Sequence, residues 1–289
     1  MKTLKQNRAA SFVVVTLVYI IATVVGVLVY RTLALHWWLS LLIADAVATV
    51  ATFIFSLIFK NASVYDPYWS VQPPVILIAF AVGRELTLLG ILLLAVVLFW
   101  AVRLTANWAY TFANLDHQDW RYTMLKEKTG FFYPIINFVG IHMVPTLVVY
   151  GCILPAVYAV REGLSVNVPA ILCLCVSLCA AVMQGIADIQ MHKFRRNRDG
   201  AFIRRGLWKY SRHPNYLGEI LMWWGIGLSV IFVAPNAWYL AAGAIANTVL
   251  FLAVSIPMAD RRQSRKEGFA EYKKDTRMLL PIKKRFVKG

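Results

Sequence analysis

Charged residues are scarce in this chain of 289 residues. Asp, Glu, Lys and Arg together make up 15% of it, whereas apolar residues make up 60%. Soluble domains carry about 25% charged and about 45–50% apolar residues. The composition therefore excludes an ordinary soluble enzyme and a disordered chain. Long apolar runs predict instead an all-α integral membrane protein, a single bundle of membrane-spanning helices.

Cysteines are few, and short nucleotide- or metal-binding motifs are missing. The four cysteines, Cys152, Cys173, Cys175 and Cys179, lie in apolar segments without metal-like spacing. We interpret them as small apolar residues and exclude a disulfide scaffold. The chain has no G-x-G-x-x-G, Walker, H-E-x-x-H or G-x-S-x-G motif. We therefore expect no metal, and any nucleotide must be bound by helix ends and basic loops.

Seven apolar runs approach the length of a membrane crossing, which needs roughly 20 residues. They cover residues 12–30, 37–59, 86–102, 135–160, 166–189, 217–233 and 238–256. An eighth run, 71–82, is shorter and is expected to form a half-helix or a re-entrant segment. Pro67, Pro73 and Pro74 are expected to stop regular helix around its start. The sequence thus predicts seven or eight crossings.

Basic residues outnumber acidic ones, 30 to 14, and they gather in three segments. Three precede residue 9, eight lie in the loop 193–212 and eleven follow Met258. Because Lys and Arg accumulate in cytoplasmic loops, this distribution favours eight crossings with both termini in the cytoplasm. The run 12–30 is expected to remain as the first helix and not to be cleaved as a signal peptide. Topology explains the basic excess, so we expect membrane lipids and no nucleic acid as partners.

Polar side chains beside the short run 71–82 form the first candidate site. Asp66, Tyr68 and Gln72 lie in a turn that is rich in aromatic residues and prolines. They could line a pocket, or the turn could be an interfacial aromatic belt in which Asp66 caps a helix.

A second candidate site ends the run 86–102. Arg103, Asn107 and Tyr110 follow one another at spacings of four and three, so they share one helix face. This face could line a cavity, or Arg103 could extend to the membrane interface.

A polar stripe ends the run 166–189. Gln184, Asp188, His192 and Arg195 are spaced by four, four and three residues, which places them on one helix face. A cytoplasmic loop explains the basic residues that follow, but it does not explain Gln184 and Asp188, because polar groups inside a membrane are costly. Gln184 and Asp188 therefore either serve a binding site or pair with other polar groups.

The segment 206–219 carries the most specific pattern. Pro214 suits the first position of a helix, so we expect a span to begin there, capped by Ser211 or His213. The free N–H groups at a helix start, together with Arg212, suit an anion such as a phosphate.

Glu219 shares a helix face with Asn215 and falls within the expected span. A carboxylate at that position needs a donor. The donor is either a ligand hydroxyl or amide, or a neighbouring Arg or Lys.

These residues carry a family resemblance. The stretch 206–227, with Ser-Arg-His-Pro-Asn-Tyr-Leu-Gly-Glu at 211–219, resembles the carboxy-terminal domain of the steroid 5-alpha reductase family and is most similar to its bacterial branch. Segments 66–69, 103–108, 119–122 and 271–281 also look similar. The resemblance implies a helix bundle of the bacterial inner membrane that binds NADPH from the cytoplasmic side. It further implies reduction of the carbon–carbon double bond of an enone, typically a 3-oxo-4-ene steroid.

The resemblance also implies roles for single residues. It implies cofactor contact for Asp188, Arg195, Asn215 and Glu219, and His192 stands where the steroid enzymes have an Arg. Tyr210 and Trp223 match positions that line the cofactor site. Separately, the amphipathic basic tail with Tyr272 could lie on the anionic inner leaflet or could cover a cytoplasmic cofactor site. The expected cofactor-binding residues are Gln184, Asp188, His192, Arg195, Tyr210, Arg212, His213, Asn215, Glu219, Trp223 and Tyr272.

The catalytic match lies in the early helices. The steroid enzymes polarise the substrate ketone with a Glu and a Tyr from this region. A lipophilic substrate is expected to enter from the bilayer. The chain is expected to form one continuous membrane domain. Within it, residues 1–110 provide the helices on the substrate side, and residues 111–289 provide further helices with the cofactor-binding loops and tail. The expected catalytic residues are Asp66, Tyr68, Gln72, Asn107 and Tyr110.

Other readings of the sequence lead to different chemistry. Arg-His-Pro-x-Tyr-x-Gly, here at 212–218, also occurs in membrane methyltransferases of the isoprenylcysteine and phospholipid type, which use S-adenosylmethionine. Those enzymes carry an adjacent Glu-Glu pair where this chain reads Ala-Asp-Arg-Arg-Gln at 259–263. Sterol reductases use the same cofactor as the steroid family. A transporter would need midplane polar sites or symmetric halves, and the sequence suggests neither.

Overall fold

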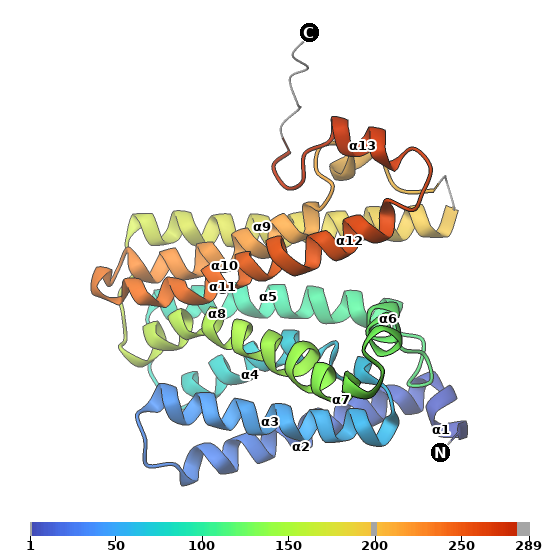
Figure 1. Cartoon of the computed structure of the whole chain (residues 1–289). Helices are drawn as coiled ribbons and strands as arrows, with labels where there is room; N and C mark the ends of the chain where they lie inside the picture. The colour runs from blue at the N-terminus through green and yellow to red at the C-terminus, as the bar shows by residue number, and fades with distance from the viewer. Residues whose placement is uncertain (1, 198–200, 282–289) are drawn as a thin grey trace. The chain divides into compact units, whose positions relative to one another are not determined.

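The computed structural model describes residues 2–197 and 201–281, and within them the chain is all-α (Figure 1). The only β-type pairing in these residues is an isolated bridge between Ser211 and Arg277. The predicted fold class, an all-α membrane helix bundle, is confirmed.

Six helical stretches of the described chain are long and apolar enough to cross a membrane. The remaining two expected crossings correspond to α4 (Tyr68–Ala81), which has 14 residues, and α10 (Pro214–Ile231), which has 18. Neither belongs to the six, and α10 carries the polar residues Asn215 and Glu219 in its first two turns. The total of seven or eight crossings stays a prediction. The six stretches are Arg8–Thr32, Trp37–Phe59, Leu88–Thr111, Trp120–Arg161, Val168–Asn197 and Pro235–Gln263.

Two compact units make up the chain, and each combines two segments. Unit 1 comprises Met1–Ile76 and Leu104–Leu154, and unit 2 comprises Leu77–Arg103 and Pro155–Gly289. The expected division at residue 110 concerned substrate and cofactor roles, and it stays a prediction.

Unit 1 is built on a helix pair, α2 (Arg8–Thr32) and α3 (Trp37–Phe59). Gly26 of α2 allows the close approach, because a Cβ at this position would lie 3.4 Å from both Ala44 O and Ala48 Cβ of α3. A short 3₁₀ turn, η1 (Ala62–Tyr65), follows α3, and Tyr19 of α2 donates a hydrogen bond to Val64 O there at 2.7 Å. The other elements that begin or lie in this unit are α1 (Lys2–Gln6), α4, α6 (Trp120–Thr129), η2 (Gly130–Phe132), α7 (Tyr133–Ile136), η3 (Asn137–Met143) and α8 (Val144–Arg161).

The prolines of α4 do not interrupt it, which corrects the expectation from the sequence. Helix α4 runs from Tyr68 through Pro73 and Pro74 to Ala81. Proline has a helical φ and lacks only the N–H, so it removes hydrogen bonds without preventing the helical backbone.

Two π-helical segments break the regularity of long helices. They are η3 (Asn137–Met143) and η6 (Phe251–Ser255), and each ends two residues before a proline, Pro145 or Pro257. A proline cannot donate to the preceding turn, and wider turns are found where that ladder is disturbed. The run 135–160 is therefore helical as predicted, but it is not a regular α-helix.

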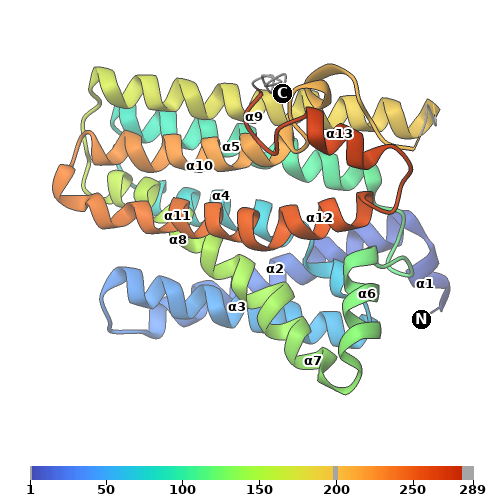
Figure 2. The same cartoon turned by 45° about the horizontal axis from the view of Figure 1, so that its top comes forward.

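Unit 2 is built on α9 (Val168–Asn197) and α10, which lie side by side (Figure 2). Gly218 and Gly225 of α10 face α9 without space for a side chain. A Cβ on Gly225 would lie 2.6 Å from Cys173 O, and one on Gly218 would lie 2.8 Å from Ala180 O. The other elements are η4 (Gly206–Lys209), η5 (Pro235–Ala241), α11 (Ala242–Leu250), η6, α12 (Ile256–Gln263) and α13 (Phe269–Asp275), and α5 (Leu88–Thr111) contributes its part up to Arg103.

We expect Gly225→Ala to destabilise the protein by about 1–3 kcal/mol, because the added methyl group would overlap the backbone of α9. Gly227→Ala is the matched control, since a Cβ at that position of the same helix has no neighbour within 4 Å. Thermal unfolding in detergent measures both. Equal unfolding temperatures for the two variants would contradict the close packing of α9 and α10.

Candidate functional site

Three helices of unit 2 bring polar side chains together inside the membrane-spanning segments. Arg103 of α5 donates from Nη1 to Asp188 Oδ2 at 3.0 Å and from Nη2 to Gln184 Oε1. Its Nη2 also lies 3.9 Å from Glu219 Oε2 of α10. Gln184 and Asp188 are four residues apart on α9, so both face the same guanidinium. We call Arg103, Gln184, Asp188 and Glu219 the Arg103 cluster.

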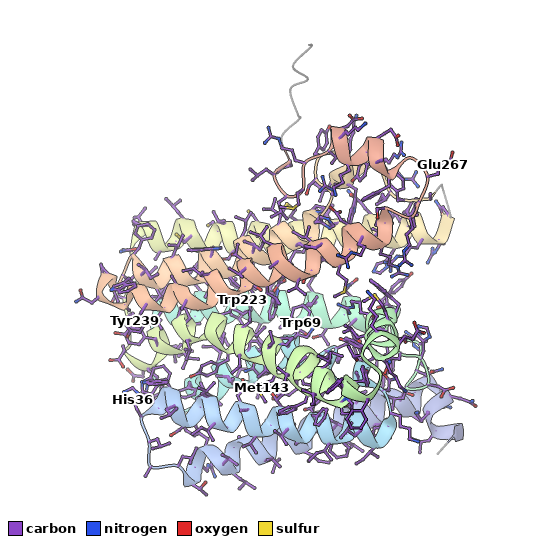
Figure 3. The ribbon with its side chains drawn as sticks, in the orientation of Figure 1. His36, Trp69, Met143, Trp223, Tyr239 and Glu267 are labelled. Carbon is purple, nitrogen blue, oxygen red and sulfur yellow. The ribbon has the colours of Figure 1, made fainter. Side chains whose placement is uncertain are left out.

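Protein side chains already satisfy the Glu219 carboxylate. Trp100 donates to Oε2 at 2.9 Å and Trp223 donates to Oε1 at 2.8 Å. The two indole rings are buried and meet edge to face at 4.9 Å. Two indoles and the nearby Arg103 therefore supply donors to Glu219 within the protein, and contact of Glu219 with a ligand stays a prediction. Trp223 lies within the helices of unit 2 (Figure 3).

Charge changes sign along α9 beyond the Arg103 cluster. Asp188 is partly buried and is also hydrogen-bonded by the side chain of Asn215. His192 is half-buried, and Arg195, one helical turn further on, is exposed. The predicted stripe therefore runs from a buried acidic end to an exposed basic end. Arg198 of the basic loop lies outside the described residues.

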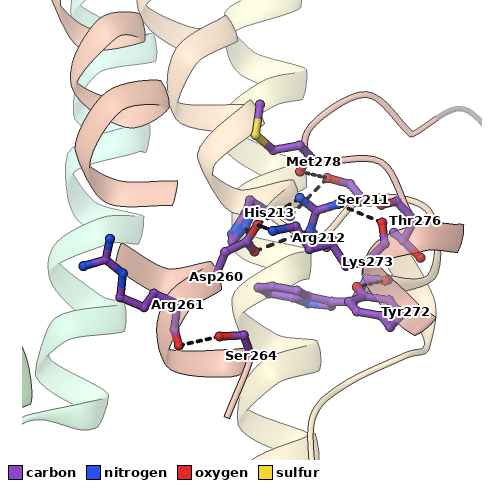
Figure 4. Close-up of polar contacts among 11 residues, drawn as sticks. Ser211, Arg212, His213, Asp260, Arg261, Ser264, Tyr272, Lys273, Thr276 and Met278 are labelled. Carbon is purple, nitrogen blue, oxygen red and sulfur yellow. Dashed lines mark hydrogen bonds and ion pairs between the residues drawn. The ribbon is translucent and has the colours of Figure 1, made fainter. Parts of the chain in front are cut away.

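Arg212 and His213 form a second ionic group around Asp260 of α12 (Figure 4). Arg212 donates from Nη2 to Asp260 Oδ2 at 2.9 Å, and His213 Nε2 lies 2.9 Å from Asp260 Oδ1. Arg212 Nη1 donates to Thr276 O at 2.7 Å, and the Arg212 N–H donates to Arg277 O at 3.0 Å. We call Arg212, His213 and Asp260, with these tail carbonyls, the Asp260 clamp.

Two predicted cofactor ligands, Arg212 and His213, make protein contacts in the Asp260 clamp. The side chains of Arg212 and His213 are both buried. Arg212 holds the carboxy-terminal segment against the start of α10 directly, whereas His213 acts through Asp260. Pro214 begins α10 as predicted, but His213, at the cap position, makes no side-chain capping bond. The segment 259–263 lacks a Glu-Glu pair, yet Asp260 within it supplies the acidic partner for the Arg-His dipeptide.

The tail itself has a small aromatic core. Phe202, Phe269 and Tyr272 pack together, and Tyr272 donates its hydroxyl to Trp208 O. Burial raises the pKa of Tyr272 to about 12, so this phenol stays neutral as a structural donor. Tyr210, by contrast, is 41% exposed.

In unit 1 the predicted catalytic residues divide between two hydrogen-bond networks. Asp66 accepts a hydrogen bond from Tyr122 at 2.5 Å, and burial raises the pKa of Asp66 to about 6 although Arg121 opposes the shift. Tyr68 and Gln72 instead contact Asp45 of α3, at 3.2 Å and 2.5 Å.

The sequence analysis missed Asp45, although a signal for it exists. It is the only charged residue in the run 37–59 and is 5% exposed. An ionisable residue inside a membrane span is by default a candidate for function. Asn107 and Tyr110 lie in unit 1 on the last turns of α5, where Asn107 is partly buried and Tyr110 is 58% exposed.

The fold and these clusters define a class: an all-α integral membrane protein with ionic groups buried between its helices. A family model described as "protein of unknown function (DUF1295)" matches residues 52–276. The match covers most of the chain, so the chain belongs to this family. Neither the curated proteins nor the solved structures give a significant match. Within the described residues, no group of three or more His, Cys, Asp or Glu side chains is placed to hold a metal ion.

We expect Asp260→Asn to release the carboxy-terminal segment. Removing one partner from a buried ion pair costs about 3–5 kcal/mol, which predicts amide hydrogen exchange in 269–278 faster by about 100-fold. Arg261→Gln is the control, because Arg261 is exposed and lies outside the clamp. Exchange measured by mass spectrometry that stays at the wild-type rate in Asp260→Asn would show that the clamp does not hold the tail.

Proposed function

We propose that this protein is a membrane-embedded, NADPH-dependent reductase of the carbon–carbon double bond of a lipophilic enone, similar to the steroid 5-alpha reductases. The observation that carries the proposal is the order of charge in unit 2. Buried carboxylates of Asp188 and Glu219 lie deeper along α9 and α10, and exposed Arg195, Arg204 and Arg205 follow toward the basic loop.

That order of charge suits a dinucleotide. Carboxylate and amide groups accept hydrogen bonds from ribose hydroxyls and from a carboxamide, and arginines bind phosphates. Arg103 Nε is buried and has no hydrogen-bond partner in the described part of the chain, so one donor of the cluster stays available for an acceptor on a ligand. These residues fit the nicotinamide and ribose end of NADPH, and the exposed arginines fit its phosphates.

The sequence resemblance supports the same cofactor. The segments that resemble steroid 5-alpha reductases lie within or overlap the part of the chain that the family model matches. The proposed topology has both termini in the cytoplasm of a bacterial cell, with the basic loop and tail on the side where NADPH is present. Among the predicted contacts we retain Gln184, Asp188, His192, Arg195, Tyr210, Asn215, Glu219 and Trp223, and we assign Arg212, His213 and Tyr272 to holding the tail.

The chemistry needs a donor for the substrate carbonyl. When bound, NADPH supplies a hydride to the β-carbon of the enone. The chain must stabilise the negative charge that develops on the carbonyl oxygen and must deliver a proton to the α-carbon. We assign these tasks to Tyr68 and Asp45, since they provide a hydroxyl and a carboxyl group in an apolar surrounding, and Gln72 orients Asp45.

We expect the purified protein to bind NADPH at least about tenfold more tightly than NADH, because the exposed arginines can pair with the 2′-phosphate. Fluorescence titration in detergent measures both affinities, and S-adenosylmethionine is titrated in parallel. Equal affinity for the two nucleotides would contradict the assigned phosphate site. Tight binding of S-adenosylmethionine without binding of NADPH would contradict the reductase and would instead support a methyltransferase. Oxidation of NADPH in the presence of enone steroids, sterols or quinone-like lipids then identifies the substrate.

Glu219→Gln and Asn215→Ala are expected to weaken NADPH binding by at least about tenfold, since each removes a group that faces the proposed nicotinamide end. The control is Glu267→Gln, because Glu267 lies exposed on the connection before α13 (Figure 3). Thermal unfolding of each variant checks the fold. If both variants stay folded and bind NADPH as the control does, the cofactor site has been assigned to the wrong cluster.

A further inference from the structure

Helix α3 carries a polar face that a membrane helix does not need for packing alone. Asp45, Thr49, Thr52 and Ser56 follow one another at spacings of four, three and four, and each is at most 5% exposed. At 1.5 Å per residue they extend over about 16 Å, roughly half of a hydrocarbon core. Buried polar residues in membrane spans are costly, and they commonly mark ion or proton pathways.

Hydroxyl groups connect the Asp45 end of this face to η1. Tyr68 donates to Asp45 Oδ1 at 3.2 Å and is also hydrogen-bonded to the side chain of Thr49. Thr49 Oγ1 lies 3.0 Å from Thr146 Oγ1, which lies 2.8 Å from the hydroxyl of Tyr65. In both of these last contacts either hydroxyl can be the donor. The three hydroxyls of Thr49, Thr146 and Tyr65 can therefore reverse their hydrogen bonds together, and Thr49 links them to Tyr68.

One acceptor without a partner, on His142, lies next to the Tyr65 end of this series, and a second, on Asn137, lies in the same π-helical segment. The His142 ring lies 4.6 Å from the Tyr65 ring, and His142 Nδ1 bonds Asn137 O at 3.0 Å. A carbonyl can only accept, so Nδ1 carries the hydrogen and Nε2 is an acceptor. Nε2 is buried and has no partner among residues 2–197 and 201–281, and the same holds for Asn137 Oδ1.

These acceptors predict bound water. A buried acceptor without a partner is destabilising, and a buried water molecule removes that cost by donating a hydrogen bond. Both acceptors belong to the π-helical segment η3, and Asn137 Nδ2 reaches Ser56 Oγ at 3.4 Å. The polar face thus continues, through water positions beside His142 and Asn137, to the last turn of α3.

We propose that Tyr68, Thr49, Thr146 and Tyr65, with water beside His142, form a proton path that supplies Asp45. Its role in turnover rests on the proposed function. Reduction of an enone adds one hydride and one proton, so a carboxyl group that gives its proton to the α-carbon must regain one before the next turnover. Each hydroxyl of the path accepts a proton on one side and releases one on the other, which restores Asp45 without net change in the path.

Thr52 lies on the same polar face as Thr49, but its contact is purely structural. Thr52 donates to the carbonyl of Ala48 at 3.1 Å, so its hydroxyl is satisfied within its own helix. Ser56 donates to the carbonyl of Phe53 at 2.8 Å and also accepts from Asn137. Thr49 instead contacts Thr146 across helices. Thr52 is therefore the matched control for Thr49, since both are fully buried threonines of α3.

Infrared spectroscopy of the full-length protein in phosphatidylcholine vesicles tests the path without cofactor or substrate. The C=O band of the protonated Asp45 carboxyl is identified by its absence in Asp45→Asn. On transfer to D₂O, we expect Thr49→Val and Thr146→Val to slow the deuterium shift of this band by at least about tenfold, because each breaks the series of hydroxyls. Thr52→Val should exchange at the wild-type rate.

Thr146→Ser keeps the hydroxyl and is expected to restore the wild-type exchange rate, which separates loss of the path from general loosening of unit 1. Wild-type exchange in both Thr49→Val and Thr146→Val would overturn the proposal, as would the absence of any Asp45 carboxylic acid band. Because the measurement needs no nucleotide, failure of NADPH to bind would overturn the reductase and leave the exchange result standing.

Discussion

The ionic contact of Arg103 with Asp188 and Glu219 is the interaction on which unit 2 depends. It joins α5, α9 and α10 through side chains that are at most 14% exposed. A single unpaired ion there would cost several kcal/mol, so each member needs the others. The glycines of α10 make the contact possible, because they bring α10 against α9 and place Glu219 beside the same guanidinium that Asp188 pairs. The close packing of α9 and α10 and the ionic contacts of Arg103 therefore depend on each other.

The same constraint explains why polar side chains of unit 1 occur in connected groups. Asp45 has two hydrogen-bond donors, and the hydroxyls near it contact one another across helices. Inside lipid, a polar group is retained only where partners surround it. Buried polar networks are therefore where specific chemistry is expected in this fold.

The sequence predicted features that depend on near neighbours. The spans, the start of α10 at Pro214 and the shared face of Gln184 and Asp188 follow from local spacing. Contacts between distant residues were out of reach: Trp100 and Glu219 are 119 positions apart, and Arg212 and Asp260 are 48 apart. Periodicity fixes which face a residue occupies and not which helix lies opposite. For that reason the contacts of Arg212 with Asp260 and with the tail carbonyl of Thr276 could not be predicted from the sequence.

The π-helical turn at Asn137–Met143 also decides which way Thr146 faces. A π turn takes up one residue more than an α turn, so the helix beyond it keeps the orientation that it would have without that residue. If this stretch became a regular α-helix with no residue lost, everything beyond it would rotate by about 100° about the helix axis. Thr146 would then no longer face Thr49, although every side chain would be unchanged. The contact between these two threonines therefore depends on the backbone of the π turn as much as on the side chains.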